Sequence, residues 1–252
     1  MLGRWLEFSV RAPDTLESLG FYKALGFHEL AIGEAYTHRY AVVSDGALCI
    51  GLHDRDFEAP ALTFVQPDLA HHALAMGDHG FDFTLMKLDE DVFNELRFED
   101  LDGHTISLVE ARTFSPPADD ARDSLCGTWF ELTLPVREAL RAGRFWAPLA
   151  PHLLTLREEP TTHMRFDAGS MAMGLSESIA LKQPGLCFKC TDRDALTDAV
   201  ERHGFRIQKY PGFEGAFAML EAPEGTRLYV FDEDFLGESY VVDESETAQG
   251  NA

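Results

Sequence analysis

The feature that most constrains this chain is that its sequence repeats. Residues 5–10 (WLEFSV) reappear as residues 129–134 (WFELTL), 124 positions later. The same offset carries Pro60 onto Pro184, and residues 80–81 (GF) onto residues 204–205 (GF). Self-similarity at a fixed period is the signature of duplicated structural units, so the sequence predicts two homologous halves.

Each half also repeats within itself, at a spacing of 54 residues. Residues 26–27 (GF) recur as residues 80–81 in the first half, and Glu138 is matched by Asp192 in the second. Within one unit an alternating strand comes first, then an acidic residue at the start of an amphipathic helix, then strands joined by a Gly-led turn. We therefore expect four modules, each with the order βαβββ.

Four such modules in register resemble the vicinal-oxygen-chelate superfamily, the group of glyoxalase I, extradiol dioxygenases and bleomycin-resistance proteins. The resemblance is carried by residues 21–27 (FYKALGF) after the first helix and residues 99–103 (EDLDG) before a closing strand, and it covers about residues 4–232. It implies an α+β fold in which two modules close into a curved eight-stranded sheet around a cup. The chain would then contain two cups.

The predicted organisation is a tandem of two glyoxalase-like domains. The first spans residues 1–113, with modules at 4–56 and 60–112, and the second spans residues 126–232, with modules at 127–178 and 184–232. The polar, proline-bearing segment 114–125 is the expected linker. Residues 233–252 are the expected C-terminal tail, which is acidic, since the chain from Asp232 onward carries seven acids and no Lys or Arg.

A formal net charge of −22 narrows the possible partners. A field of that sign repels phosphate backbones and anionic lipids, so we expect neither nucleic acid nor membrane as a partner, and either a monomer or a homodimer. No apolar run approaches the ~20 residues that cross a bilayer, and residues 1–10 do not resemble a signal peptide, which favours a cytoplasmic location. The four cysteines are too irregularly spaced for a disulfide framework.

Strand parity predicts which side chains face each cup, because successive residues of a strand point to opposite faces. In the first strand Leu6, Phe8 and Val10 are expected to pack under the helix. The residues expected to bind a ligand in the first cup are Glu7, Ser9, His53, Thr63 and Ser107. Those expected in the second cup are Trp129, Glu131, Thr133, Cys187, Arg227, Tyr229 and Phe231, with Lys189 and Arg227 near Glu131 as either an anion pocket or a solvated ion pair.

The superfamily's metalloenzymes hold a divalent ion with His or Glu at one position on each opening strand and one on each closing strand. Carried onto this chain, those positions are Glu7, Ala61, Glu131 and Gly185 on the opening strands, and Gly51, Ser107, Gly174 and Tyr229 on the closing strands. One carboxylate per cup is insufficient for a metal that needs three or four protein ligands. We expect no metal and no other cofactor; His53 beside Glu7 is the remaining route to one.

Other candidate residues carry less specific signals. Thr37-His38 and Thr162-His163 recur before the third strand of their modules, so either histidine could reach a cup wall as an acid or base, or could be structural. Cys187 and Cys190 have C-x-x-C spacing, but on a strand this places the sulfurs on opposite faces, as expected of small buried residues. The sequence contains no nucleophile elbow, P-loop or dinucleotide fingerprint.

Three functional hypotheses follow. The first is a metal-independent protein of the glyoxalase/bleomycin-resistance type that binds a small organic molecule in one or both cups. The second is an enzyme of the same fold, a lyase, isomerase or ring-cleavage dioxygenase, that uses Glu7 with His53, or Glu131 with Tyr229, as acid and base. The third is a non-catalytic interaction scaffold, which filled cups would favour and an open cup above ~300 Å³ would disfavour.

Overall fold

The computed structural model describes residues 2–32, 38–89, 93–110, 124–150, 152–158, 161–168, 171–208 and 217–232. Most of the predicted linker and the whole predicted tail lie outside these residues. None of the helices in this part of the chain is long and apolar enough to cross a membrane.

The described elements follow the predicted modular order. The first half contains β1 (Arg4–Arg11), α1 (Thr15–Ala24), β2 (His28–Glu29), β3 (Tyr40–Ser44), β4 (Cys49–His53), β5 (Ala61–Val65), α2 (Leu69–Asp78), β6 (Phe83–Lys87), β7 (Glu95–Glu99) and β8 (Thr105–Val109). The second half contains β9 (Thr128–Pro135), α3 (Ala139–Trp146), β10 (His152–Arg157), β11 (His163–Asp167), β12 (Ala172–Ser176), β13 (Gly185–Cys190), α4 (Arg193–Arg202), β14 (Phe217–Glu221) and β15 (Arg227–Asp232).

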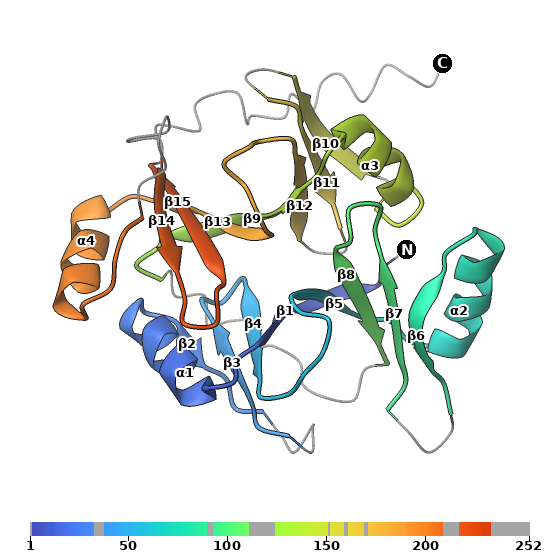
Figure 1. Ribbon diagram of the computed structural model, residues 1–252, viewed down its shortest axis with the longest axis horizontal. Helices are drawn as coiled ribbons and strands as arrows, with labels where there is room; N and C mark the ends of the chain where they lie inside the picture. Colours follow the sequence, from blue (N-terminus) through green and yellow to red (C-terminus); the bar gives the residue numbers. More distant parts are fainter. Residues whose placement is uncertain are drawn as a thin grey trace.

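The strands form two mixed sheets, which confirms the α+β class (Figure 1). The first sheet has the order β2-β3-β4-β1-β5-β8-β7-β6, and the second has the order β10-β11-β12-β9-β13-β15-β14. At the centre of each sheet the opening strands of two modules run antiparallel, and each has a closing strand parallel to it on its other side. The second sheet has seven strands among the described residues; residues 209–216, between α4 and β14, are outside them.

The acidic residue before each helix caps it in two of the four modules. The Asp14 carboxylate accepts a hydrogen bond from the backbone N–H of Glu17 at 3.0 Å, and Asp192 accepts one from Ala195 at 2.9 Å. Asp68 has a left-handed backbone and makes no cap bond, and Glu138 makes none either. An acidic residue therefore occupies the N-cap of all four helices, as predicted, and its side chain caps α1 and α4 by a hydrogen bond.

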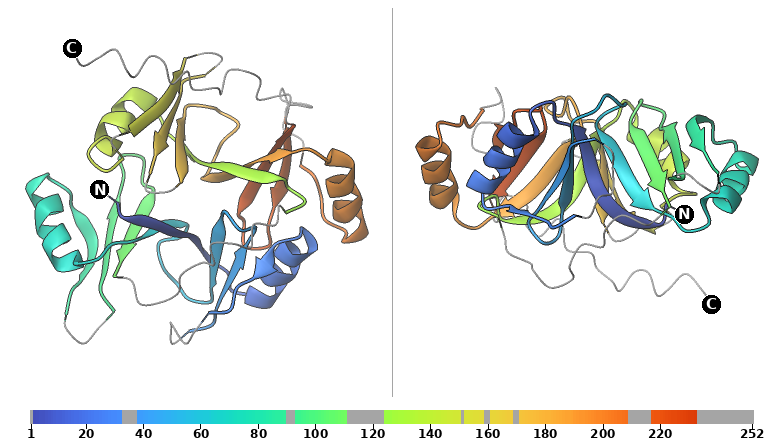
Figure 2. Two further views of the ribbon diagram at one scale, coloured as in Figure 1. Left: turned by 180° about the vertical axis from the view of Figure 1, so that it is seen from behind. Right: turned by 90° about the horizontal axis from the view of Figure 1, so that it is seen from below.

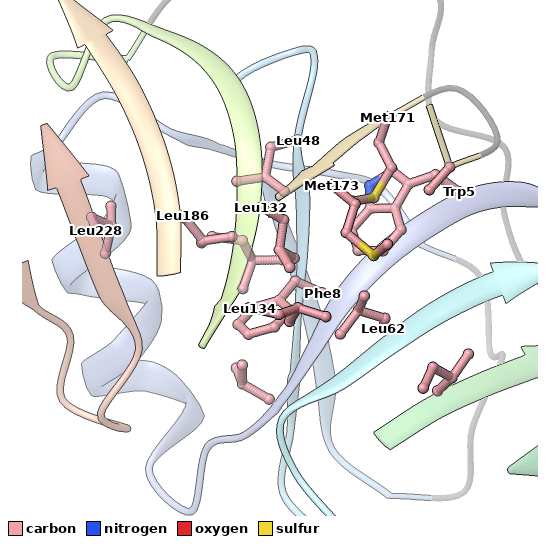
Figure 3. Packing of buried hydrophobic residues seen from close by; sticks show 14 of the residues in the cluster. Trp5, Phe8, Leu48, Leu62, Leu132, Leu134, Met171, Met173, Leu186 and Leu228 are labelled. Carbon is pink, nitrogen blue, oxygen red and sulfur yellow. The ribbon is translucent and has the colours of Figure 1, made fainter. Parts of the chain in front are cut away.

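The helices lie on the outer rim of the molecule, and the two sheets share one hydrophobic core between them (Figure 2). At its centre Trp5 of β1 stacks on Trp129 of β9, with ring centroids 6.5 Å apart. Figure 3 shows Phe8 and Leu62 of the first sheet packed beside Leu132 and Leu134 of the second. Because one core serves both halves, the two cups are held in a fixed relation to each other.

A hydrogen bond from a helix of one half to a turn of the other half occurs in both directions. The hydroxyl of Tyr22 on α1 donates to Glu224, in the turn before β15, at 2.6 Å. The indole N–H of Trp146 on α3 donates to Asp100, in the turn before β8, at 3.3 Å. The molecule therefore has a pseudo-twofold arrangement that follows from the sequence repeat.

The predicted strand parity fails at one end of each central strand, because β-bulges interrupt the pairing there. A bulge between Trp5 and Glu7 places Leu6 with Val65 in a small cluster apart from the main core, and not under the helix as predicted. The pairing of β13 with β9 shifts at Cys187 and Phe188, and Trp129 packs against the main core. The prediction that Trp129 faces the second cup is therefore wrong.

Candidate functional site

The first cup is organised around the carboxylate of Glu7, which lies on β1 and is only 1% exposed. One of its oxygens accepts hydrogen bonds from Ser9 Oγ at 2.7 Å and lies 2.9 Å from His53 Nε2, and the other accepts one from the Tyr40 hydroxyl. Three partners from three different strands thus hold a single buried carboxylate. A buried charge needs such partners, because its desolvation is otherwise costly.

The direction of the hydroxyl hydrogen bonds follows from counting protons. Ser9 Oγ has one proton and gives it to Glu7, so the contact of 2.7 Å between Ser9 and Thr63 must be donated by Thr63. The chain Thr63 to Ser9 to Glu7 therefore aligns all of its donors toward the carboxylate. This alignment favours the ionised form of Glu7.

The pKa of Glu7 reflects two opposing effects. Burial is the largest single effect, and it raises the pKa. The hydrogen bond and charge of His53 and the hydrogen bonds from Tyr40 and Ser9 lower the pKa, and together they outweigh burial. The net result is a pKa below the ordinary value for a glutamic acid. Glu7 is therefore a carboxylate at neutral pH despite its burial.

Behind Glu7 lies a pair of histidines. His53 Nδ1 is 3.0 Å from His38 Nε2, so that Glu7, His53 and His38 form a continuous chain from the interior to a half-buried position. Burial, followed by the charges of His53 and Arg55, lowers the pKa of His38 to about 4. His38 is therefore neutral at pH 7.

The mouth of the first cup is covered by side chains. The guanidinium of Arg97 on β7 lies 2.6 Å from Glu95 and 2.8 Å from Glu58, and it stands 5.6 Å from the ring centroid of Phe57. Ser107 of β8 donates to Glu95 at 3.2 Å. The cavity that remains, lined by Ser9, His53, Arg55, Phe57, Ala61, Thr63, Glu95, Arg97, Ser107 and Val109, measures about 20 Å³. That is room for about one water molecule or one polar atom of a ligand.

The second cup contains the counterpart of Glu7 but surrounds it differently. Glu131 on β9 is 1% exposed and accepts a hydrogen bond from Thr133 Oγ1. His163 Nε2 lies 3.2 Å from this carboxylate, and Arg165 Nε lies 3.4 Å from it. The cation at Glu131 is therefore Arg165, rather than the predicted Lys189 or Arg227.

The two predicted cations of the second cup have other partners. Arg227 forms an ion pair of 3.1 Å with Glu221 on the neighbouring strand, and the Lys189 ammonium lies 6.0 Å from the ring centroid of Phe130. Of the two alternatives, the anion pocket with Glu131 is wrong for the described residues, while Arg227 does form a partly solvated ion pair, with Glu221 as its partner.

The remaining predicted residues of the second cup take part in packing. Tyr229 lies so close to Gly185 that an added Cβ there would be 2.6 Å from its ring. The ring of Phe231 packs against the rings of Phe130 and Phe217, with centroid distances of 6.1 Å and 5.5 Å. Among the described residues Glu131 makes no hydrogen bond to Tyr229, so the two do not form the acid–base pair suggested above. These aromatic rings pack together in one cluster in the second cup.

Cys187 in the second cup corresponds in position to Thr63 in the first, since each is paired with the buried glutamate of its cup. Its sulfur lies 3.3 Å from Thr133 Oγ1, and since Thr133 gives its proton to Glu131, the thiol must donate. Burial raises the pKa of Cys187 far above its ordinary value, and the nearby charge of Glu131 raises it further. Cys187 is therefore a neutral thiol that occupies the position of Thr63, and not a nucleophile.

The residues at the metal positions implied by the superfamily do not fit a metal ion. At Gly51 an added Cβ would clash with the Glu7 carboxylate, and at Gly174 it would clash with Glu131. Each carboxylate thus occupies the space that a closing-strand ligand would need, and its oxygens are already bonded to other donors. No cluster of three or more His, Cys, Asp or Glu side chains in the described part of the chain could hold a metal ion.

The structure brings most of the predicted first-cup residues together: Ser9, His53, Thr63 and Ser107 line the cavity, and Glu7 bonds to two of them. Sequence reasoning did not assign Tyr40, Arg97 or Arg165 to a site. These residues lie on β3, β7 and β11, the middle strands of their modules, whose faces were not assigned from parity. The recurring Thr-His pairs were the one sequence signal for side chains in this part of each module. His38 contacts His53 in the first cup, and His163 contacts Glu131 in the second.

The fold is similar to that of several solved structures. No family model matches the sequence, and no curated protein matches it. The structure is similar to the 2,3-dioxygenase LapB from Pseudomonas sp. KL28, with a TM-score of 0.61 and 12% identity over 92% of this chain and 93% of that one. It is also similar to an extradiol ring-cleaving dioxygenase from B. fuscum, with a TM-score of 0.61 and 16% identity over 91% and 71%.

A third similar structure is the 2,2',3-trihydroxybiphenyl 1,2-dioxygenase of Sphingomonas wittichii strain RW1, with a TM-score of 0.55 and 15% identity over 92% of this chain and 91% of that one. These similarities extend over almost the whole chain. The chain therefore has the two-domain fold of the extradiol dioxygenases, as the sequence resemblance implied.

Proposed function

We propose that this chain is a metal-independent small-molecule-binding protein of the glyoxalase/bleomycin-resistance type, with its first cup as the principal site. The observation that carries the proposal is the Glu7 cluster. Its carboxylate lies against Gly51 and is held by Ser9, Tyr40 and His53, so the cup is polar and preorganised without a metal. Buried polar networks of this kind need a reason beyond stability, since an apolar core of the same size would serve stability equally well.

The ligand that suits this cup is a small aromatic molecule with oxygen substituents. The cavity of about 20 Å³ accepts one oxygen atom among Ser9, Thr63 and Ser107. Phe57 at the mouth offers a ring face, and Arg97 offers a buried cation. The names of the similar dioxygenases indicate hydroxylated aromatic rings as substrates of those proteins, which supports the same chemical class here.

Entry of a ligand requires the mouth to open, and Glu58 is the group best placed to move. Its side chain is 62% exposed, and it contacts Arg97 from the solvent side. A hydrogen bond with its own backbone, and then the hydrogen bond from Arg97, lower the pKa of Glu58. Glu58 is therefore ionised at neutral pH. An incoming oxygen could replace Glu58 on Arg97 while Glu95 keeps its own contact.

The experiment uses catechol as the probe, with the full-length protein in EDTA and the histidine ring nitrogens observed by NMR. We expect saturable shifts of the His53 and His38 signals. Glu58→Ala should tighten binding several-fold, because it frees Arg97, whereas the exposed control Glu17→Ala should leave binding unchanged. Absence of His53 shifts, or shifts that need added Fe²⁺, would contradict the proposal.

A second candidate function is an acid–base enzyme, which the chain Glu7, His53 and His38 favours. A proton could pass along these three groups between the interior and the half-buried His38. Both ring nitrogens of His53 are already engaged, however, which supports binding better than proton abstraction from a ligand. Formation of a new product from catechol, lost on His53→Gln, would favour the enzyme; binding without any product would favour the binding protein.

The scaffold hypothesis is supported by the small cavity of the first cup and by the packed aromatic cluster of the second. The first cup leaves far less than ~300 Å³, and the second contains the aromatic cluster of Phe130, Phe217, Tyr229 and Phe231. The cavity beside the buried carboxylate argues for a ligand in the first cup. The catechol titration separates the two, because a scaffold would show no saturable shift at His53.

A further inference from the structure

We infer that the groove between the two halves of the molecule is a second binding site, which accepts a small organic carboxylate. The groove has a volume of about 460 Å³ and lies outside both cups. Its walls are the turn before β8, the end of β9 and the segment from β12 to β13. The inference does not depend on the function proposed for the first cup.

The first observation is that a histidine lies in the groove wall, where it can report whether the groove is occupied. His104 lines the groove and is 9% exposed, and its Nε2 atom has no hydrogen-bond partner in the part of the chain that the structure describes. The other side of the residue is fixed: its backbone N–H donates to Asp100 at 2.9 Å, and Nδ1 lies 3.6 Å from the same carboxylate. Because Nε2 is itself buried, it is not a ligand contact, but the residue lies at the groove and its NMR signals would report a ligand bound there.

The second observation is the sign of the charge around the groove. Arg137 and Lys182 line it, and the one carboxylate among the lining residues belongs to Asp102. Arg137 uses Nε for Asp102 at 2.8 Å and Nη2 for the Leu101 carbonyl at 2.9 Å, which leaves Nη1 for another acceptor. Lys182 is exposed and forms no ion pair among the described residues. In a chain with a net charge of −22, this excess of cations is a local reversal that suits an anion.

The third observation concerns size and polarity. A volume of about 460 Å³ is ordinary for a small-molecule site. Val136, Leu181 and the repeated prolines Pro60 and Pro184 provide apolar surface beside the cations. A carboxylate on a compact ring or short apolar body therefore matches the groove: its oxygens would accept from Arg137 and Lys182, and its body would contact the prolines.

The test uses benzoate as the probe and benzamide as its neutral counterpart, again with the histidine rings of the full-length protein observed by NMR. We expect benzoate to shift the His104 signals saturably and to leave those of His53 unchanged. Benzamide should bind at least about tenfold more weakly, since it lacks the charge, which corresponds to ~1.4 kcal/mol. Arg137→Gln and Lys182→Gln should each weaken benzoate binding about fivefold or more, in line with the loss of one charge-assisted contact.

Lys87→Gln is the matched control, because Lys87 is an exposed lysine on β6, away from the groove. It should leave the affinity for benzoate unchanged. Equal binding of benzoate and benzamide, or no loss of affinity in the Arg137 and Lys182 variants, would overturn the inference. Shifts at His53 in place of His104 would also overturn it, while supporting ligand entry into the first cup, so the two proposals fail separately.

Discussion

The two cups share one arrangement and differ in what surrounds it. In both, a buried glutamate on the opening strand lies against a glycine on the closing strand, and a hydroxyl two residues later bonds to it. The register of the strands shows which neighbours have changed: His163 occupies the position of Tyr40, Arg165 that of Val42, and Ser176 that of His53. The contact between carboxylate and glycine is thus common to both cups, while the donors differ.

This difference shows that the buried carboxylate is compatible with more than one set of hydrogen-bond and ion-pair partners. In the first cup it is held by hydroxyls and by a histidine that leads to a second histidine. In the second cup it is held by a hydroxyl, a histidine and a guanidinium, and an aromatic cluster lies in the same cup. Both cups therefore retain a buried polar cluster, and the cavity of about 20 Å³ beside the cluster of the first cup is lined by Ser9, His53, Thr63 and Ser107.

The largest effect is expected from Gly51→Ala and Gly174→Ala, which attack the shared contact. The added methyl group would displace Glu7 or Glu131 from its partners and leave a buried charge poorly compensated. We expect each to lower the free energy of unfolding by about 4 kcal/mol, measured by chemical denaturation. Equal stability of either variant and the wild type would show that the carboxylate does not need this space.

Gly20→Ala is the matched control, because it introduces the same methyl group where no atom lies within 4 Å. Gly20 lies inside α1, where alanine is the better helix former. This variant should be more stable than the wild type by roughly 0.5–1 kcal/mol.

The next effect compares Glu7→Gln with Glu131→Gln. Glutamine keeps the shape but removes the charge, and its amide nitrogen would face a donor in either cup. We expect a loss of about 3 kcal/mol for Glu7, whose hydroxyl and imidazole partners lie in the interior, and about 2 kcal/mol for Glu131. The smaller value follows because the Arg165 side chain is 19% exposed and can be partly rehydrated. A larger loss at Glu131 would reverse our ranking of the two cups.

A smaller effect is the response of the first cup to acid. The pKa of His38 is lowered from 6.5 to about 4 by folding, so between these values the unfolded chain takes up a proton that the folded chain does not. Stability should therefore fall as the pH drops from 6.5 toward 4, and His38→Gln should show a shallower fall. His71→Gln, at an exposed position on α2, should follow the wild type. Glu7, whose pKa is lowered, adds a further loss only below about pH 4.5.

The smallest effect is expected from exchanging the outermost donors of the two clusters. Thr63→Cys would give the first cup the thiol of the second, and Cys187→Thr would do the reverse. Each exchange keeps a donor toward Ser9 or Thr133, so the unfolding free energy should change by less than about 1 kcal/mol. Thr63→Val, which removes the donor, should cost more than Thr63→Cys; if it does not, the proton order assigned to this chain is wrong.

The fold could be predicted from the sequence because its evidence is repeated four times. The helix ends at Gly26 and Gly80, for example, carry the same signal in two modules. The cup linings were predicted only as far as the strands are regular: parity places Ser9 and Thr63 correctly at the first cavity and fails at Leu6 and Trp129. A β-bulge depends on pairing with another strand, and neither bulge here is marked by glycine or proline.

The charged contacts were the least predictable part of the site. Arg97 meets Glu58 and Glu95, and Arg165 meets Glu131, although each arginine is far from one of its partners in the sequence. Such pairs depend on which strands become neighbours and on side-chain reach. The net charge of the chain gives no indication of them, since it describes mainly the outer surface.

The central claim is that the glutamate of each cup is held by the protein's own donors instead of by a metal ion. Elemental analysis of the full-length protein, purified without chelators and then supplied with Fe²⁺, Mn²⁺, Zn²⁺ or Ni²⁺, tests this most directly. We predict well under one metal ion per chain and no change in melting temperature on addition of metal or EDTA. One tightly bound ion per chain, lost on Glu7→Ala or Glu131→Ala, would contradict the account.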